Sequence, residues 1–453
     1  MGCSILNLYK LRDVVKIDSI LIFLSKILLK LCKAFGGGSS LPGRILLKLR
    51  PGILSRLSIG YKVIIVTGTN GKTTTASMIT SVLKTAGKKV INNSSGANMT
   101  DGIASCFIEN YKKCGWAVIE CDEAYTRIVM RYIKPEYMVV TNIFRDQLDR
   151  FGEIYTTWEK IKDAIALSPS TELFLNADEA IFAETEFKNK VHYFGFSQGN
   201  GKMSSNVDSA FCKNCGERFK FNFITFKNLG DYYCPKCGFS RPAPEFTLDE
   251  IKNVTVDGSV VMICSEEVTL SVSGVYNMYN ALAAFAVAMR AGIDKETIAR
   301  GIASQQSRFG RNEMIDVGGT KMQLSLIKNP TGCDQCIDTI TLFDKPCSLL
   351  ILLNDNWADG TDVSWVWDAH FENLKKLDAD KIIIGGTRRF DMAVRLKTAG
   401  FDEKKFIIAE DDDAVIGEIS GCGNRVFALA TYTAMTGLRR TMYKKGIVKK
   451  MWK

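Results

Sequence analysis

Residues 63–74 read VIIVTGTNGKTT, and this stretch decides the fold. The β-branched run over residues 63–67 predicts a buried strand, and the pattern that follows, polar and then apolar through Leu83, predicts a helix. Glycines in the turn between them let backbone N–H groups close around phosphate oxygens, and the helix N-terminus adds positive potential. A glycine-containing turn with a fortuitous lysine is the alternative, which the preceding strand and the following helix disfavour. We therefore predict an α/β domain with a phosphate-binding loop.

The loop carries the side chains that a nucleoside triphosphate needs. The ammonium group of Lys72 can reach the β- and γ-phosphates, and Thr73 would supply a hydroxyl group to Mg²⁺. The predicted nucleotide-binding residues of the loop are Gly68, Thr69, Asn70, Gly71, Lys72, Thr73 and Thr74.

Similar strand and helix signals recur along the chain. Short apolar runs at residues 117–121, 137–141 and 173–176 predict further strands of a parallel sheet covered by helices. After a helical pattern at 277–291 and a hinge at 307–312, strands are predicted at 348–353, 381–384 and 425–430. We expect three units: an amphipathic helix with a Gly/Ser/Pro linker (1–43), a nucleotide-binding α/β domain (44–312) and a Rossmann-like C-terminal α/β domain (313–453).

Two cysteine pairs interrupt the first α/β domain, in a segment of short polar and aromatic pieces at about residues 204–242. Each pair has the spacing Cys-x2-Cys and is followed by glycine. Two such knuckles can hold Zn²⁺ tetrahedrally with no open position for water, so we predict a structural zinc ribbon. The predicted ligands are Cys212, Cys215, Cys234 and Cys237. We interpret the lone pair Cys333 and Cys336 as a coincidence of small residues.

The composition bounds the class of protein. With 453 residues, 46% of them hydrophobic and 24% charged, the chain suits two or three globular domains and excludes fibrous and disordered classes. The net charge of +10 suits an anionic partner, which could be a nucleotide, a phospholipid surface, a pyrophosphate-bearing substrate or nucleic acid. Most of the 14 cysteines stand singly in apolar runs, and no cleavable signal pattern is present, so we expect a cytoplasmic protein.

The N-terminal segment is apolar but not uniformly so. Residues 14–33 are interrupted by five charged side chains, which disfavours a membrane span. We expect an amphipathic helix that packs on the body or rests on an anionic membrane surface. The second alternative predicts a peripheral protein at the inner face of the membrane of a Gram-positive-type bacterium.

The phosphate loop also carries a family resemblance. Its glycine spacing is shorter than in the common pattern Gly-x4-Gly-Lys-Ser/Thr, and it resembles the loop of Mur ligases and folylpolyglutamate synthases. Those families use ATP to convert a carboxylate into an acyl phosphate, which an amine then attacks. The resemblance implies Mg²⁺ ligands at Thr73 and Glu120 and nucleotide contacts from Asn277 and Arg311. Taken singly, Glu120 could be a solvated strand end, Asn277 a helix cap and Arg311 a surface ion pair, but they occur in family order.

Two details of the resemblance concern magnesium and lysine. Residues 141–150 resemble the family's Thr-Asn segment, with Gln147 in place of a histidine that helps to bind magnesium. Lys160 and Lys162 lie in the neighbourhood of a lysine that several Mur ligases carbamylate, but the local match assigns neither.

The C-terminal domain narrows the resemblance to one branch of these ligases, the MurT family. Residues 352–365 read LLNDNWADGTDVSW, which is similar to the MurT signature. Only 67 residues precede Gly68, whereas the UDP-sugar-binding domain of other Mur ligases needs roughly 100. The resemblance implies ATP-dependent amidation, through an acyl phosphate, of the α-carboxylate of D-glutamate in the lipid II stem peptide to D-isoglutamine, a step of peptidoglycan synthesis.

The same resemblance implies a partner. In MurT proteins the aspartate that matches Asp355 orients the histidine of a Cys/His glutaminase, GatD, which supplies ammonia from glutamine. The chain has only two histidines and no convincing Cys–His pair of its own, which fits such a partner. An Asp/Asn/Gly turn with a helix cap is the alternative for residues 359–362.

Two other functions stay open on sequence alone. One is an amino-acid-adding ligase like folylpolyglutamate synthase, which needs no ammonia donor. The other is a nucleic-acid-binding protein that uses the zinc ribbon and the basic charge. Binding to nucleic acid is not expected, because no basic patch interleaved with aromatic residues is evident.

Overall fold

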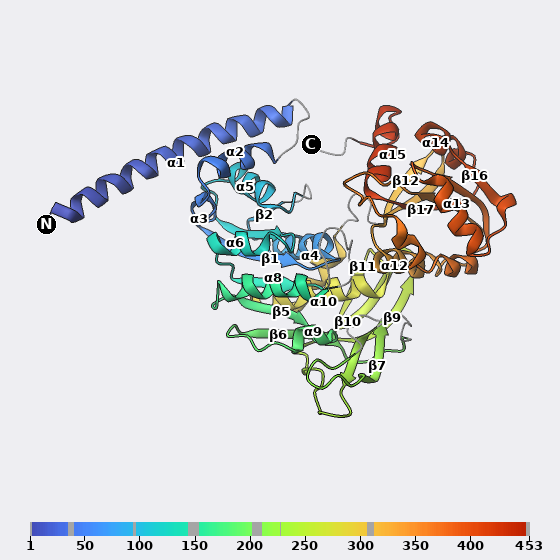
Figure 1. Cartoon of the computed structure of the whole chain (residues 1–453), viewed down its shortest axis with the longest axis horizontal. Coiled ribbons are helices and arrows are strands. Elements are labelled where there is room, and N and C mark those ends of the chain that lie inside the picture. Colours follow the sequence, from blue (N-terminus) through green and yellow to red (C-terminus); the bar gives the residue numbers. More distant parts are fainter. Residues whose placement is uncertain are drawn as a thin grey trace.

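The computed structural model describes residues 2–34, 40–93, 97–143, 154–201, 211–226, 228–305 and 312–449, with side chains from residue 17 onward. Figure 1 shows two α/β bodies side by side, with a long N-terminal helix that packs on the first towards its C-terminal end and projects beyond it at the other. The first body, called here the middle domain, is built on a nine-stranded sheet, and the C-terminal domain is built on a six-stranded sheet.

The strand order of the middle-domain sheet is β11-β10-β9-β6-β5-β4-β1-β3-β2. Strands β1 to β6 and β9 pair in parallel, which confirms the predicted parallel sheet over most of its width. The remaining edge differs from the prediction, because β9, β10 and β11 form an antiparallel meander. The strands are β1 Tyr61–Thr67, β2 Val90–Asn92, β3 Gly115–Glu120, β4 Tyr137–Val140, β5 Glu172–Asn176, β6 Val191–Phe196, β9 Phe246–Thr255, β10 Gly258–Ile263 and β11 Glu266–Leu270.

Strand β1 is buried on both faces, as expected for the centre of a parallel sheet. Ile64 and Val66 point into an apolar core under α4, α10 and α11, whereas Val63 and Ile65 point into a second core under α5, α6 and α8. The helices of this domain are α2 Leu41–Leu49, α3 Ile53–Leu57, α4 Lys72–Thr85, α5 Thr100–Glu109, α6 Thr126–Tyr132, α8 Ile154–Ala166, α9 Ala180–Ala183, α10 Val275–Arg290 and α11 Lys295–Ala303.

The order of the parallel strands reverses at β1, which pairs with β3 on one side and with β4 on the other. Val66 lies in register with Glu120 and with Val139, so the loops that follow these three strands meet at one edge. Ligands of open α/β sheets bind outside the carboxyl ends of the strands at such a reversal. The fold therefore places the predicted phosphate loop at the position where a ligand is expected.

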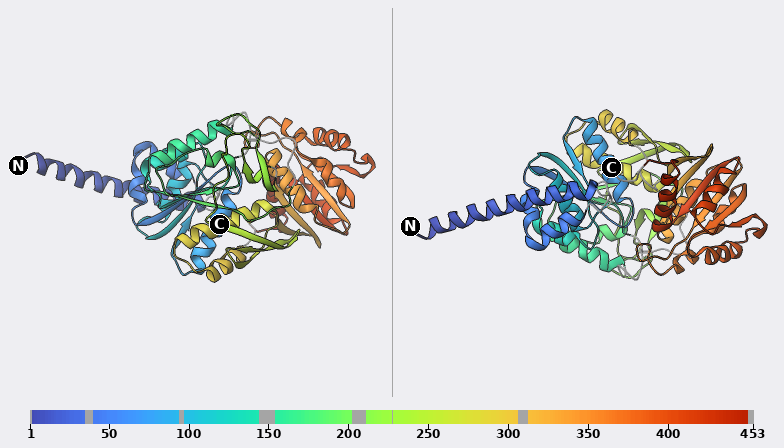
Figure 2. Two further views of the ribbon diagram at one scale, coloured as in Figure 1. Left: turned by 90° about the horizontal axis from the view of Figure 1, so that it is seen from below. Right: turned by 90° about the horizontal axis from the view of Figure 1, so that it is seen from above.

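The C-terminal domain repeats the arrangement with strand order β12-β13-β17-β14-β15-β16, parallel except for the β12–β13 hairpin. Figure 2 shows its helices on both faces of this sheet. The elements are β12 Glu313–Val317, β13 Thr320–Leu326, β14 Cys347–Leu352, β15 Ala379–Gly385, β16 Phe406–Ile408, β17 Arg425–Ala430, α12 Pro330–Ile340, α13 Arg389–Thr398, α14 Asp412–Ser420, α15 Tyr432–Lys444 and the 3₁₀ turns η1 Ser364–Trp367, η2 Phe371–Lys376 and η3 Glu403–Lys405. Cys333 and Cys336 are buried in its core, consistent with a pair of small apolar residues.

The N-terminal unit differs from the prediction at its end. Helix α1 spans Gly2–Ala34, but residues 41–43, predicted to belong to the linker, already belong to α2. Gly43 is buried against α5, where a Cβ atom would lie 1.9 Å from Asp101 O. The glycine is therefore required by helix packing and does not indicate a flexible segment. No helix among the described residues is long and apolar enough to cross a membrane.

Candidate active site

The loop between β1 and α4 depends on two glycines. Gly68 and Gly71 have φ angles of 121° and 85°, which residues with side chains rarely adopt. A Cβ atom would lie 2.4 Å from Thr141 Oγ1 at Gly68 and 2.1 Å from Asn280 Oδ1 at Gly71. No side chain caps the N-terminus of α4, so its backbone N–H groups face the loop, where an anion can bind them.

The end of β4 holds the loop from the other side. Thr141 Oγ1 and Asn142 Nδ2 donate hydrogen bonds to Asn70 O at 2.6 and 3.0 Å, and Asn142 Oδ1 accepts one from Asn70 N at 2.9 Å. Within the described residues, the buried Asn70 Nδ2 and Thr67 Oγ1 have no hydrogen-bond partner. Because buried polar atoms are normally paired, these two fit a loop that closes on a polar ligand.

Lys72 is buried and folds back over the loop. Its Nζ atom donates to Gly68 O at 2.5 Å and lies 2.9 Å from Glu123 Oε1. Burial alone would lower the pKa of Lys72, but the carboxylates of Glu123 and Glu120 outweigh it and raise that pKa, so the ammonium group stays charged. Burial raises the pKa of Glu123, which the charge of Lys72 offsets only in part. Glu123 was not among the predicted site residues, although the acidic run after β3 is visible in the sequence.

The two predicted magnesium ligands lie together. Thr73 Oγ1, in the first turn of α4, donates a hydrogen bond to Glu120 Oε2 at 2.7 Å. Glu120 ends β3, and Asn98 Nδ2 donates to its other carboxylate oxygen at 3.2 Å. A hydroxyl and a carboxylate oxygen are hard ligands of the kind that Mg²⁺ prefers, so this pair fits the ion.

Helix α10 approaches the loop through Asn280 more closely than through Asn277. Thr75 Oγ1 donates to Asn280 Oδ1 at 3.2 Å, and Asn280 Nδ2 donates to Asn277 Oδ1 at 3.1 Å. Asn277 itself is buried and donates to Ser273 O. Asn277 therefore reaches the loop only through Asn280 in this structure, and its predicted contact with the nucleotide stays a prediction.

The remaining predicted loop residues are placed as follows. Thr69 and Thr74 are buried beside Lys72, in the loop and in the first turn of α4 respectively. Arg311 and Gln147 lie outside the described residues. Lys162 forms an ion pair with Glu159 at 2.6 Å on α8.

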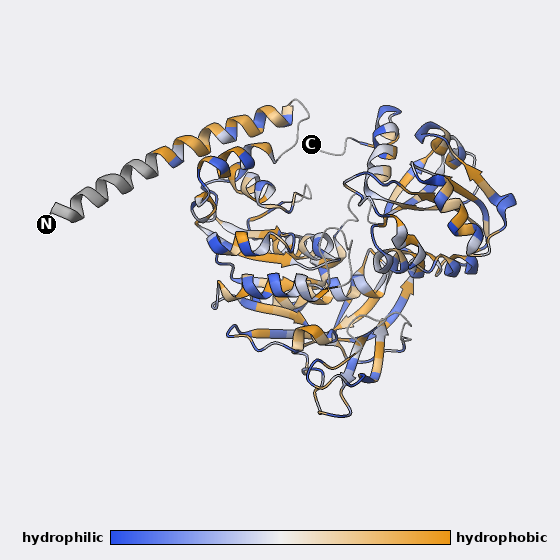
Figure 3. Ribbon diagram, in the orientation of Figure 1, coloured by the Kyte–Doolittle hydropathy of each residue, from blue (hydrophilic) through white to orange (hydrophobic). Residues whose placement is uncertain are grey.

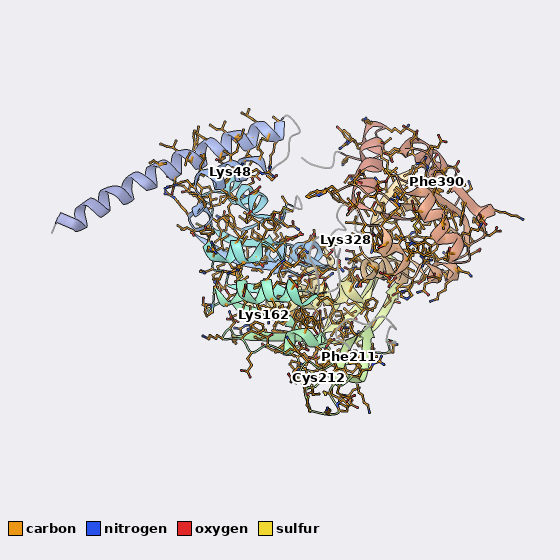
Figure 4. All side chains as sticks on the ribbon, viewed as in Figure 1. Lys48, Lys162, Phe211, Cys212, Lys328 and Phe390 are labelled. Atoms are coloured by element: carbon orange, nitrogen blue, oxygen red, sulfur yellow. The ribbon has the colours of Figure 1, made fainter. Side chains whose placement is uncertain are left out.

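The four ribbon cysteines form one cluster, at the far end of the middle domain from Lys48 (Figure 4). Their Sγ atoms all lie within 4.8 Å of one another, with Cys212–Cys237 at 3.5 Å and Cys215–Cys234 at 3.4 Å. Thiolates around a tetrahedral Zn²⁺ are about 3.8 Å apart, so the cluster fits the ion. Gly216 N and Gly238 N donate to the carbonyl groups of Cys212 and Cys234 at 2.7 and 3.1 Å, which closes both knuckles.

A buried polar network joins this ribbon to the nucleotide side of the domain. The hairpin of strands β7 Lys220–Phe226 and β8 Leu229–Tyr233 completes the ribbon. Behind it, Arg241 pairs with Asp178 at 2.5 Å, and Tyr279 on α10 donates to the other oxygen of Asp178 at 2.5 Å. Burial raises the pKa of Asp178, and the charge of Arg241 offsets this in part. The network therefore connects the ribbon to the helix that carries Asn280.

Asp355 lies in the C-terminal domain, three residues after β14. Thr387 Oγ1 donates to its Oδ1 atom at 2.9 Å, and Arg388 Nη1 donates to Oδ2 at 3.1 Å. These hydrogen bonds lower the pKa of Asp355, so it is ionised at neutral pH. The Asp355 side chain is 31% exposed. Trp357, close in sequence to Asp355, and Phe390, close to Arg388, are mostly exposed. Asp355 is thus oriented within its own chain while one edge faces outward.

Neighbouring polar residues are used structurally. Asp359 accepts a hydrogen bond from Thr433 N at 2.7 Å, and burial raises the pKa of its carboxyl group. Asp362 accepts from Ser364 N at 2.8 Å. The alternative interpretation of residues 359–362 as a turn and cap therefore describes these two aspartates, but it does not describe Asp355.

Comparison with known proteins relates both domains to one family. Residues 66–288 match the model of the Mur ligase middle domain, and residues 326–435 match that of the MurT ligase C-terminal domain. The chain is 40% identical to the MurT subunit of glutamine-hydrolysing lipid II isoglutaminyl synthase from Streptococcus pneumoniae over 92% of this chain and 94% of that one. It is 33% identical to the same subunit from Staphylococcus aureus over 91% of this chain and 95% of the relative.

Solved structures agree at the level of the fold. A pseudomurein peptide ligase type C from Methanothermus fervidus superposes with a TM-score of 0.65 at 24% identity, covering 86% of this chain and 80% of the other. MurF from Acinetobacter baumannii superposes with a TM-score of 0.64 at 17% identity, covering 90% and 81%. With near-complete coverage of relatives at up to 40% identity and a matching C-terminal model, the chain belongs to the MurT family, the Mur ligase-type subunits of glutamine-hydrolysing lipid II isoglutaminyl synthase.

Proposed function

We propose that this chain is the synthetase subunit that amidates the α-carboxylate of D-glutamate in the lipid II stem peptide. The observation that carries the proposal is the meeting of Lys72, Thr73 and Glu120 at the N-terminus of α4, in a chain that aligns with MurT along nearly its full length. Those relatives are subunits of a glutamine-hydrolysing synthase, which supports glutamine as the source of the amide nitrogen. The loop binds ATP, and the substrate carboxylate binds beside its terminal phosphate.

The proposed reaction has two steps. The γ-phosphoryl group of ATP passes to a carboxylate oxygen, which gives ADP and an acyl phosphate. Ammonia then attacks the acyl carbon, the C–N bond forms, and inorganic phosphate leaves as the C–O bond breaks. Bound Mg²⁺ would neutralise phosphate charge next to Thr73 and Glu120.

The residues of the chain support the first step by electrostatics and position. Lys72 must leave Glu123 to reach the phosphates, and Glu123 keeps it charged until then. The N–H groups at the start of α4 bind the phosphate oxygens. Exclusion of water protects the acyl phosphate from hydrolysis before ammonia arrives.

A glutaminase partner would deliver that ammonia, and we place its contact at Asp355. The carboxylate is ionised, held by Arg388 and Thr387, and exposed at one edge, so it can accept a hydrogen bond from a histidine of another protein. The GatD-type glutaminase implied by the family resemblance carries such a histidine. The ribbon cysteines bind Zn²⁺ as a structural ion, because all four ligands would be protein sulfur.

The test is amidation by the purified complex. Lipid II incubated with ATP, Mg²⁺ and glutamine should lose about 1 Da by conversion of an acid to an amide, measured by mass spectrometry. The Asp355→Asn variant should lose glutamine-driven amidation and keep ammonium-driven amidation. Asp391→Asn, which removes the other carboxylate bound to Arg388, is the matched control and should retain both.

Other results would redirect the proposal. Loss of both activities in Asp355→Asn would assign this residue to the ligase reaction instead. Consumption of ATP with an amino acid but not with ammonium would favour the amino-acid-adding ligase.

A further inference from the structure

Helix α1 has two apolar faces. One faces the body and buries Ile22 and Leu29, with Ile22 joining the core of the middle domain. The other is exposed over the described part of the helix. Its large side chains recur every three or four residues, which places them on the side opposite the buried ones. They are Ile17, Ile20, Phe23, Leu24, Ile27 and Leu31.

Helix α2, which packs against α1, also has exposed apolar side chains. Leu41, Ile45 and Leu49 are exposed on it, although Leu46 between them is fully buried. We call these three and the six of α1 the N-terminal apolar face. Among the described residues it holds nine of the 25 exposed large apolar side chains, within 33 positions of the chain. Figure 3 shows the corresponding hydrophobic colouring along α1. A concentration of this kind marks an interaction surface.

The charged side chains of residues 17–49 are basic with one exception. Between residues 17 and 49 the only acid is Asp18, which is buried and paired with Arg50 and Arg56. Lys26, Lys30 and Lys48 form no ion pair with any described residue, and Figure 4 shows Lys48 on α2. Lys33 and Arg44 pair with acids of α5, at 2.6 and 2.9 Å. The surface therefore has positive charge that the protein itself does not neutralise.

We propose that the N-terminal apolar face docks the protein on an anionic phospholipid surface. Aliphatic side chains and one phenylalanine would enter the boundary between headgroups and acyl chains, while the flanking lysines would contact lipid phosphates. The face is the outside of a helix, not a groove, and lysines that no acid of the described chain pairs with lie beside it. Charge complementarity therefore favours a lipid surface over a protein partner.

Docking would bring the protein to a substrate that stays in the membrane. Only this consequence rests on the proposed function, since it requires a lipid-linked substrate. Docking itself rests on the side chains of α1 and α2. Helices α1, α2 and α15 lie at the top of the molecule in Figure 1, so a membrane at that side would face both domains.

The experiment measures co-sedimentation of the full-length chain, purified with its glutaminase, with vesicles that contain no lipid II. Vesicles of phosphatidylglycerol and phosphatidylcholine should bind it, and binding should weaken at high salt and on pure phosphatidylcholine. Leu24→Glu should weaken binding about tenfold or more, because it places a charge in the buried half of the interface. Ile128→Glu on α6, at 47% exposure against 54% for Leu24, is the matched control and should bind like the parent.

Each other outcome contradicts the proposal. Equal binding of Leu24→Glu and the parent would overturn it, as would equal loss in Ile128→Glu. A dimer that Leu24→Glu dissociates, without vesicle binding by the parent, would assign the face to a second copy. Loss of the glutaminase from Leu24→Glu would assign it to that partner.

The proposed function is tested separately. Leu24→Glu should amidate detergent-dispersed lipid II at the rate of the parent. If the parent bound vesicles but amidated nothing, the proposed function would fail and the docking would stand.

Discussion

At the scale of single residues, Lys72 forms an ion pair with Glu123, and in the proposed function a phosphate would have to displace that carboxylate. The ion pair with Glu123 is nearly inaccessible to solvent, with 11% and 7% of the two side chains exposed. Removing one member of a buried pair is costly because the other charge is left unpaired. The pair therefore holds Lys72 in the loop, and the carboxylate of Glu123 helps to keep it charged.

Glu123→Gln should lower the free energy of unfolding by about 3 kcal/mol without nucleotide. Because an ATP phosphate then replaces the missing carboxylate, a non-hydrolysable ATP analogue should raise the melting temperature of this variant more than that of the parent. Lys72→Met/Glu123→Gln removes both charges and should be less destabilised than Glu123→Gln alone. An equal response of the variant and the parent to the analogue would show that Glu123 does not hold Lys72.

A substitution at Gly71 tests whether the loop requires a residue without a side chain at this position. Its φ angle of 85° and the approach of Asn280 Oδ1 leave no room for a methyl group, so Gly71→Ala should weaken ATP binding by about 100-fold. Gly87, at the end of α4, has a φ angle of 71° but no atom within 4 Å of a Cβ. Gly87→Ala should therefore lose about 1 kcal/mol of stability and keep ATP affinity. Calorimetric titration with ATP separates the two.

At the scale of elements, the zinc ribbon and α10 are joined by Asp178. Its carboxylate accepts from Tyr279 on α10 and pairs with Arg241 behind the ribbon. Gly195 on β6 makes this possible, because a Cβ there would lie 2.4 Å from both Arg241 and Asp178. The ribbon is therefore connected, through Asp178, to the helix that contacts the phosphate loop.

Removal of zinc should have both a local and a remote effect. Cys212→Ser should lose bound zinc, which elemental mass spectrometry measures. The ribbon of this variant should also be cleaved more readily by protease. Through Asp178 and α10 the substitution should raise the KM for ATP by about fivefold, or about 1 kcal/mol of coupling. Cys333→Ser, in the C-terminal core, should retain the metal. An unchanged KM in metal-free Cys212→Ser would show that the network carries no coupling.

At the scale of the whole molecule, local patterns predicted the strands and the phosphate loop well. Strand β17 matches its predicted residues 425–430, and β1 and α4 lie where the loop motif requires. These elements are encoded by neighbouring residues, namely β-branched runs and glycines. The ribbon cluster was predictable for the same reason, because cysteine spacing is local.

What the sequence did not reveal depends on contacts between distant residues. Glu123 and Asn280 reach the loop only because β3 and α10 pack against it. Gly43 looked like part of a linker, but it is required by the close approach of α2 to α5. The antiparallel edge β9 to β11 escaped prediction because alternating strands carry weaker signals than a buried parallel strand.

The two domains contact each other through the turn between β9 and β10. Val256 in that turn is buried in the apolar core of the C-terminal domain. Next to it, Asp257 accepts hydrogen bonds from Arg425 of β17 at 2.6 and 3.2 Å. This turn can serve as a pivot, because it anchors the middle domain in the core of the C-terminal domain while the phosphate loop and Asp355 lie on different sheets.

Reversing the charge at the pivot should therefore separate chemistry from nucleotide binding. Asp257→Lys places a cation against Arg425 and should open the domains, seen as a larger radius of gyration in small-angle scattering. Because water then reaches the acyl phosphate, ammonium-driven amidation should fall about tenfold in kcat, with ATP hydrolysis less affected and the affinity for ATP unchanged. The swap Asp257→Arg with Arg425→Asp should restore part of both. A normal kcat in Asp257→Lys would mean that the domain contact plays no part in protecting the intermediate.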